Sequence, residues 1–266
     1  MRLFLLLTLL AEIACAQSKI RLVDSQSQLG IAYANIWCDG KLLVSTDSTG
    51  TANLALKDCS KLTVSATGFK TKTIDVAHST VFLDADTLQI RDVEVRRPTF
   101  KKSLTLGKVK SGDIGIVVRR ENTVGSVGRF FASAGDYFLK EFQFKAHRSD
   151  NRLVTISVYG VDKNQKPDEL LVQTIVKQLP KGNGICKVDL TPYQISMPED
   201  GVFISVNFVL IDQNKNFSER SPEWFFYEPS LNATRTGGFE NTWHLDESGW
   251  KKSENYRLDF ALKLTD

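Results

Sequence analysis

The sequence predicts an all-β protein made of two consecutive β-sandwiches. Apolar residues recur at every second position through most of the 266 residues, which is the spacing of strands with one buried face. Asp39-Gly40 stands between two such runs and predicts a tight hairpin, because glycine adopts a positive φ at no steric cost. Turn residues recur about every ten positions, which is typical of sandwiches and not of folds in which strands alternate with helices.

The first 16 residues have the pattern of an export signal. Arg2 precedes an apolar run from Leu3 to Leu10, and Ala14-Cys15-Ala16 gives a small-x-small cleavage pattern before Gln17. The apolar run is shorter than a membrane span, which takes about 20 residues. We therefore expect a signal peptide over residues 1–16, with an N-terminal anchor as the alternative. Lipidation of Cys15 is a second alternative, which the charge of Glu12 disfavours because a lipoprotein signal needs an apolar residue there.

The composition of the rest of the chain limits its partners. A net charge of +3 is too small to indicate nucleic acid as a partner. No later apolar run approaches membrane length, so we expect no transmembrane segment in the mature chain. The oligomeric state is left open.

Three cysteines remain after cleavage. An odd number in an exported protein predicts one disulfide and one leftover thiol. Cys38 and Cys59 lie in the same predicted domain and form the candidate pair, with two buried thiols as the alternative. Cys186 alternates with Val188 and Leu190, so we expect it to be buried and inert.

The first sandwich is expected over residues 17–96. Its strands are predicted by alternating apolar residues at Ile20 and Leu22, at Ala34, Ile36 and Cys38, at Leu54 and Leu56, and at Leu62, Val64 and Ala66.

Several segments of this domain resemble the carboxypeptidase regulatory-like domain, a small seven-stranded, transthyretin-like sandwich. The resemblance rests on Ala34-Asn35-Ile36, Thr46-Asp47-Ser48-Thr49-Gly50, Leu62 to Phe69, Val81-Phe82-Leu83 and Ile90 to Val95. Phe69 replaces the family's usual Tyr, and Asp92 replaces its usual Glu. The resemblance implies an accessory module of Bacteroidetes-type envelope proteins, located in the periplasm or at the cell surface of a Gram-negative bacterium. It implies no peptidase activity, because it covers the accessory domain alone.

Residues 97–106 are predicted to link the two sandwiches. Arg96, Arg97, Lys101 and Lys102 surround Pro98. Cations resist burial, and proline cannot donate a hydrogen bond to a sheet. An electrostatic contact with an anionic membrane or glycan is the alternative interpretation of this basic run.

The second sandwich is expected over residues 107–266, with longer strands in a jelly-roll-like antiparallel arrangement. It resembles the C-terminal regions that follow the regulatory-like module in Bacteroidetes proteins of unassigned function. The apolar runs are Phe142 to Ala146, Val154 to Val158, Val202 to Leu210 and Tyr256 to Leu264. Polar residues alternate with them, for example Ser205, Asn207, Arg257, Asp259 and Lys263, which predicts sheets with one face in water.

No catalytic motif is found in the sequence. His78, His147 and His244 are far apart and have no Cys, Asp or Glu at a metal-ligand spacing, so we expect no metal site. A Gly-x-Ser-x-Gly elbow and a phosphate-binding loop are both absent. We therefore expect neither a cofactor nor an enzyme activity.

Aromatic residues concentrate in the last third of the chain. Trp224, Trp243 and Trp250 fall within 27 residues, together with Arg235, His244 and Asp246. Aromatic rings stack on the apolar faces of sugars while charged groups bind the hydroxyls, so these six residues form the predicted ligand site. The alternative is that the rings pack in the core or pair across a hairpin.

These observations favour an exported, non-catalytic binding or accessory protein of the cell envelope, whose partner is a glycan or a protein. One alternative is a hydrolase of an envelope polymer. Asp246 and Glu247 argue against it as a facing acid/base pair, because successive residues of a strand point to opposite faces. A purely structural or assembly subunit is the other alternative.

Overall fold

The computed structural model of the protein describes residues 18–54, 59–76, 78–86, 101–119, 124–218, 221–235, 237 and 241–266. The expected signal peptide, the segment Ile90 to Val95 and linker residues 97–100 lie outside this set. The described chain consists of strands and two short 3₁₀ helices, Thr191–Tyr193 and Asp212–Asn214, which confirms the all-β sandwich class. None of its described helices has the length and hydropathy to cross a membrane.

The first sandwich has two sheets, and strand β1 of the smaller sheet pairs antiparallel with β4 and parallel with β7. The described strands are β1 (Ser18–Asp24), β4 (Thr51–Leu54) and β7 (Thr80–Leu83) in one sheet, and β3 (Lys41–Ser45), β2 (Asn35–Cys38), β5 (Lys61–Ser65) and β6 (Lys72–Asp75) in the other. The side chains between the sheets are apolar and buried, and they include Ile20, Leu22, Ile36, Leu62, Val64 and Leu83.

Turn chemistry sets the register of this domain. Asp39 and Gly40 have φ angles of 48° and 78°, and they join β2 to β3 in the hairpin that the sequence predicts. Asp47 closes the next turn, because its Oδ1 accepts hydrogen bonds from the backbone N–H groups of Thr49 (2.8 Å) and Thr51 (3.0 Å). A disulfide joins Cys38 at the end of β2 to Cys59, with their Cα atoms 6.0 Å apart.

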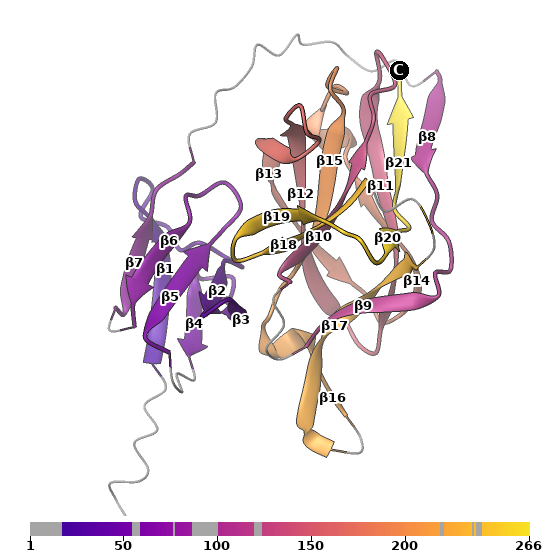
Figure 1. Cartoon of the computed structure of the whole chain (residues 1–266). Coiled ribbons are helices and arrows are strands. Elements are labelled where there is room, and N and C mark those ends of the chain that lie inside the picture. The colour runs from indigo at the N-terminus through magenta and orange to yellow at the C-terminus, as the bar shows by residue number, and fades with distance from the viewer. Residues whose placement is uncertain are drawn as a thin grey trace, which may run out of the picture.

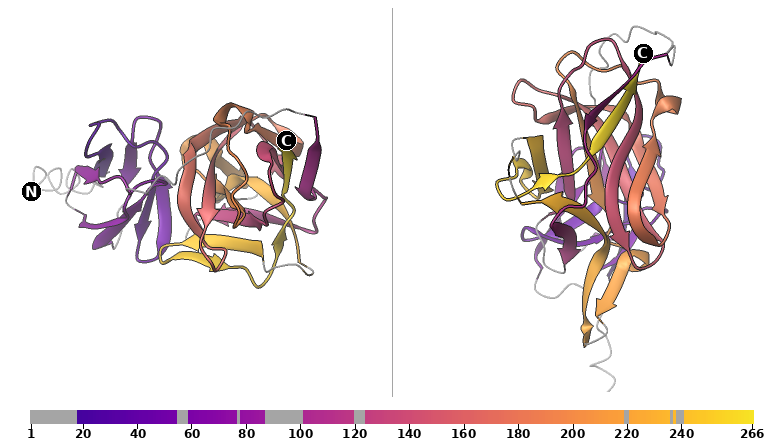
Figure 2. Two further views of the ribbon diagram at one scale, coloured as in Figure 1. Left: turned by 90° about the horizontal axis from the view of Figure 1, so that it is seen from above. Right: turned by 90° about the vertical axis from the view of Figure 1, so that its right-hand side faces the viewer.

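The second sandwich has a six-stranded and an eight-stranded sheet (Figures 1 and 2). The six-stranded sheet has the order β13 (Pro167–Leu179), β12 (Arg152–Val161), β15 (Val202–Phe208), β10 (Ser126–Phe131), β18 (Thr242–Asp246) and β19 (Gly249–Lys252). The eight-stranded sheet contains β16 (Lys215–Ser218), β17 (Ser221–Thr234), β11 (Phe138–Arg148), β21 (Ala261–Thr265) and β8 (Ser103–Gly107), with β14 (Gly182–Asp189), β20 (Arg257–Leu258) and β9 (Ile114–Arg119) paired to members of that path.

Strand β8 begins within the segment that the sequence predicts to be a linker. Residues 103–106, assigned to the linker over 97–106, belong to strand β8, which pairs antiparallel with the C-terminal strand β21. The alternating Leu104 and Leu106 follow directly after the basic run. Two leucines with this spacing are enough to add an edge strand once a partner strand is present.

The large core lies between the two sheets of the second sandwich. The apolar runs predicted from the sequence supply it, including Phe142, Phe144, Val154, Ile156, Val158, Ile204, Val206 and Leu262. Phe142 packs edge-on against Phe260 with ring centroids 5.2 Å apart. Cys186 and Val188 lie in this core, as the sequence predicts.

The outer face of the six-stranded sheet differs from the expectation. Ser205 and Asn207 were predicted to face water, but they are only 0% and 8% exposed. Asp259 of the other sheet is also buried, and it accepts a hydrogen bond from Thr234. The first sandwich lies against this side of the second one, beside β12, β13 and the β18–β19 hairpin (Figures 1 and 2).

Apolar packing and hydrogen bonds hold the first sandwich against the second. Trp37 and Leu42 come from the first sandwich but pack in the core cluster of the second. The Ser45 N–H donates to the Leu210 carbonyl (3.1 Å), and the Leu210 N–H donates to Ser45 Oγ (2.9 Å). The two domains therefore share a packed interface.

This interface predicts that a substitution in the first sandwich destabilises the second. Leu42→Ala removes a buried side chain and should lower the free energy of unfolding by about 2–4 kcal/mol. Hydrogen exchange should rise in β10 and β12, measured by mass spectrometry beside urea unfolding. Leu43→Ala, on the next residue of β3, packs against the first core and serves as the matched control. Equal exchange in both variants would contradict the shared core.

Candidate functional site

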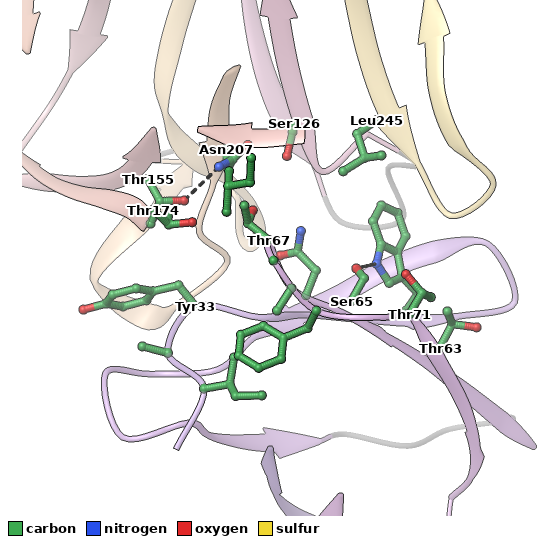
Figure 3. Close-up of a pocket in the computed structure, with 18 of the residues that line it drawn as sticks. Tyr33, Thr63, Ser65, Thr67, Thr71, Ser126, Thr155, Thr174, Asn207 and Leu245 are labelled. Atoms are coloured by element: carbon green, nitrogen blue, oxygen red, sulfur yellow. Dashed lines mark hydrogen bonds between the residues drawn. The ribbon is translucent and has the colours of Figure 1, made fainter. Parts of the chain in front are cut away.

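A cavity of about 610 Å³ lies between the first sandwich and the outer face of the six-stranded sheet (Figure 3). Strands β2 and β5 form one wall, and strands β10, β12, β13 and β15 form the other. The turn of the β18–β19 hairpin closes one end. Hydroxyl and amide groups line both walls: Tyr33, Asn35, Thr63, Ser65, Thr67 and Thr71 on one side, and Ser126, Thr155, Tyr159, Thr174 and Asn207 on the other.

Asn207 organises the wall that the second sandwich contributes. Its Nδ2 donates to Thr155 Oγ1 (3.1 Å) and to Ser157 Oγ (2.9 Å), and its Oδ1 accepts from Ser205 Oγ (2.9 Å). These residues come from neighbouring strands, because β12 and β15 are paired with Thr155 opposite Asn207. The amide orientation is thereby fixed at the floor of the cavity.

Tyr159 joins this network to the first sandwich. Burial raises the pKa of its hydroxyl above the ordinary tyrosine value, and hydrogen bonds with Thr67, Ser157 and Ser205 oppose that shift only in part. Ser157 Oγ also contacts Thr67 Oγ1 across the domain boundary at 3.4 Å. Tyr159 is therefore a neutral hydrogen-bonding group at neutral pH.

Trp37 and Ser65 position the opposite wall. Trp37 Nε1 donates to Ser65 Oγ (3.0 Å) across the β2–β5 pair. The ring itself is buried against Gly125, where a Cβ atom would lie 3.0 Å from the indole. Gly125 therefore allows the close approach of the two domains, since a larger residue would displace the indole.

Ser126 and Asn35 are buried residues on the cavity walls, and each has a polar side-chain atom that bonds to no described residue. Ser126 is 2% exposed and lies opposite Asn207 in the β10–β15 register, and its hydroxyl points into the cavity (Figure 3). Asn35 is also buried; its Oδ1 accepts from Ser45, but its Nδ2 donates to no described group. Neither atom is among the fully enclosed, unpartnered polar atoms of the described residues, so both are reached from the cavity and are available to water or to a bound molecule.

Trp250 adds an aromatic surface to the same cavity. Its ring packs edge-on against Phe203 (centroids 5.0 Å apart) and Tyr159 (6.4 Å). It is partly exposed and lines the cavity beside Leu245. One side of the ring is thus held by packing while another remains available to a ligand.

The structure places the residues of the predicted ligand site in several different surroundings. Trp250 and Asp246 line the cavity, whereas Trp243 is buried beside Phe203 and stands opposite Lys252 in the hairpin. The Trp243 N–H has no hydrogen-bond partner among the described residues. Lys252 Nζ lies 5.2 Å from the Trp243 ring centroid, a cation–π geometry. Trp243 therefore contributes packing, which the sequence left as the alternative.

Three other predicted residues lie away from the cavity walls. His244 is half-buried, and burial lowers its pKa while the charge of Asp246 opposes that shift. Arg235 is exposed after β17, with its backbone N–H bonded to Asp113. Trp224 is 73% exposed on β17 in the other sheet, where β16 and β17 project from the body (Figure 1). A second hollow, of about 490 Å³, brings Trp243, His244 and Trp250 together beside Lys251 and Lys252, whereas Trp224 and Arg235 line neither hollow.

Among the described residues, no group of three or more His, Cys, Asp or Glu side chains is arranged to hold a metal ion. Cys186 is a free, buried thiol whose pKa is raised by burial. Arg148 Nη1 lies 2.8 Å from its sulfur.

Sequence reasoning missed most of the cavity. Thr155, Ser205 and Asn207 alternate with large apolar residues exactly as solvent-facing residues would, so the pattern alone does not reveal burial. One signal was present: the outer face of the central strand β15 carries Phe203, Ser205 and Asn207 and no charged residue.

Comparisons with known proteins show no close relative. No family model matches the chain, and no curated protein matches it. One solved structure contains the cysteine protease and lectin-like domains of Cwp84, a surface layer associated protein of Clostridium difficile; it has 10% identity and a TM-score of 0.36, and it covers 54% of this chain and 32% of that one. A second, the clostridial cysteine protease Cwp84 after propeptide cleavage, has 10% identity and a TM-score of 0.41, with coverages of 83% and 53%. This chain thus spans about a third and about half of those chains.

The Tyr159 network predicts a pH-dependent stability. The unfolded chain loses the tyrosine proton near pH 10, before the folded protein does, so stability should fall as the pH rises above about 10. Tyr159→Phe should lower stability by about 1–2 kcal/mol at pH 8, because its partners lose a hydrogen bond. The variant should also show a shallower alkaline decline in urea unfolding. Tyr193→Phe, at an exposed tyrosine, is the control. An unchanged alkaline slope in Tyr159→Phe would refute the assignment.

Proposed function

We propose that this chain is an exported, non-catalytic binding protein of the cell envelope, and that its ligand occupies the cavity between the two sandwiches. The observation that carries the proposal is a pair of polar side-chain atoms, Ser126 Oγ and Asn35 Nδ2, which bond to no described residue and face a hydroxyl-lined cavity. A ligand with hydroxyl groups pairs with both atoms in place of water.

The lining favours a saccharide. Ligand cavities typically enclose about 300–1,000 Å³, and this one, at about 610 Å³, has room for a short oligosaccharide. Threonine, serine and asparagine groups match sugar hydroxyls, and the ring of Trp250 offers an apolar surface for a sugar face. The sequence also predicts a glycan ligand from aromatic and polar side chains, but it places the site at a different set of residues.

The hydrogen bonding of the polar groups in the cavity favours ligand binding over catalysis. Ser157, Ser205 and Asn207 bond to one another, and no His or Cys is among the described residues that line the cavity. Hydroxyls held in this way orient a ligand, whereas an activated nucleophile needs an adjacent general base. An envelope-polymer hydrolase finds less support in this arrangement.

Export is supported by two features of the chain. The first 16 residues have the pattern of a cleavable signal. The Cys38–Cys59 disulfide suits an oxidising compartment. We therefore propose the periplasm or the cell surface as the location.

The proposal predicts which tryptophan affects binding. Trp250→Ala should weaken saccharide binding at least several-fold, because stacking contributes on the order of 1 kcal/mol. Trp224→Ala, the same substitution at an exposed ring of the other sheet, should leave affinity unchanged. A glycan array would identify a saccharide, and calorimetry would measure each variant against it.

A second variant separates binding from folding. Ser126→Leu places an apolar side chain in the cavity and should abolish binding, while circular dichroism reports whether the fold is kept. If a folded Ser126→Leu variant binds the array hit as the wild type does, the ligand does not occupy this cavity. If Trp224→Ala is the variant that loses binding, the site lies on the projecting β16–β17 strands instead.

A further inference from the structure

The charged residues that line the cavity are all acidic. Asp24, Asp246 and Glu247 belong to its lining, and no described Lys, Arg or His does. The chain as a whole carries a net charge of +3. The charged side chains of the cavity lining therefore have the opposite sign to the net charge of the molecule.

Asp24 is held as a carboxylate at the end of β1. Its Oδ2 accepts from Ser27 Oγ (2.6 Å), and its Oδ1 accepts from the Gln26 N–H (3.0 Å). These hydrogen bonds lower the pKa of Asp24 below its ordinary value. Its negative charge is present throughout the neutral pH range.

Glu247 and Asp246 lie on the turn of the β18–β19 hairpin. Glu247 Oε1 accepts a hydrogen bond from Thr63 Oγ1 (2.8 Å), which brings the carboxylate across to the wall of the first sandwich. Asp246 forms an ion pair with Lys251 (2.6 Å), so its charge is compensated locally. Asp24 and Glu247 supply the net negative potential of the cavity.

On the basis of the proposed function, we propose that the cavity takes a saccharide that bears a positively charged amino group. Hydroxyl groups of such a ligand match Ser126, Asn35 and the Asn207 network, and its ammonium group is attracted by Asp24 and Glu247. A saccharide with carboxylates meets repulsion from the same two residues. The cavity thus selects among sugars by charge.

Three oligosaccharides with the same β-1,4-linked backbone test this selection: the tetramer of glucosamine, cellotetraose and the tetramer of glucuronate. Calorimetry at about pH 6 keeps amines protonated and carboxylates ionised. The amino tetramer should bind about five-fold or more tightly than cellotetraose, the effect of roughly one close charge pair in water. The glucuronate tetramer should bind more weakly than cellotetraose. The amine preference should shrink as salt is added.

Matched variants assign the effect to the two carboxylates. Asp24→Asn and Glu247→Gln keep the size of each side chain, and Gln retains an acceptor for Thr63. Each should reduce the ratio of the amino tetramer's affinity to that of cellotetraose. Asp75→Asn removes an exposed carboxylate of β6 outside the cavity and should leave the ratio unchanged.

The outcomes separate the two proposals. Binding of the neutral tetramer with equal or greater affinity than the amino tetramer overturns the charge selection and leaves the saccharide site intact. An equal loss of preference in Asp75→Asn also overturns it, because the attraction is then a general surface effect. If none of the three tetramers binds, the saccharide function fails and the charge selection fails with it.

Discussion

The fold depends on burying a polar sheet face. The six-stranded sheet presents Ser205, Asn207 and Thr155 on the side away from its own core, and the first sandwich covers them. Removing such groups from water is unfavourable unless each finds a hydrogen-bond partner. The Asn207 network satisfies most of them internally. Ser126 Oγ and Asn35 Nδ2 bond to no described residue, and the cavity between the two walls keeps both atoms accessible.

Apolar contacts hold this polar interface together. Trp37 and Leu42 anchor the first sandwich in the core of the second, while the hydrogen bond from Thr63 to Glu247 joins the domains through the β18–β19 hairpin. Burial of a large side chain contributes about 1.5–3 kcal/mol, more than a typical hydrogen bond. Trp37 and Leu42 therefore contribute most of the free energy that holds the two domains together. The polar groups between the domains determine which ligand the cavity accepts.

Much of the fold follows from local signals in the sequence, and the candidate site follows much less. Asp39-Gly40 and the alternation at Leu62 and Val64 depend on neighbouring residues, so sequence alone indicates the hairpin and the strand. The burial of Asn207 depends on a domain far away in the chain, and a polar face looks the same whether it meets water or a second domain. Trp224 and Trp250 both lie in the aromatic-rich last third of the chain, yet only Trp250 reaches the cavity. Strand β8 was missed because its pairing partner is the C-terminal strand.

Trp37 and Leu42 belong to the first sandwich but pack in the core of the second. This arrangement has an evolutionary consequence. If the first sandwich were joined to a different partner, it would carry two large apolar side chains on its surface, and the second sandwich would expose Asn207 and its neighbours to solvent. Neither half is then a freely transferable module, although small accessory sandwiches are often treated as such. Substitutions on one side of the boundary are constrained by the other side, so the two halves are expected to be inherited and to diverge as one unit.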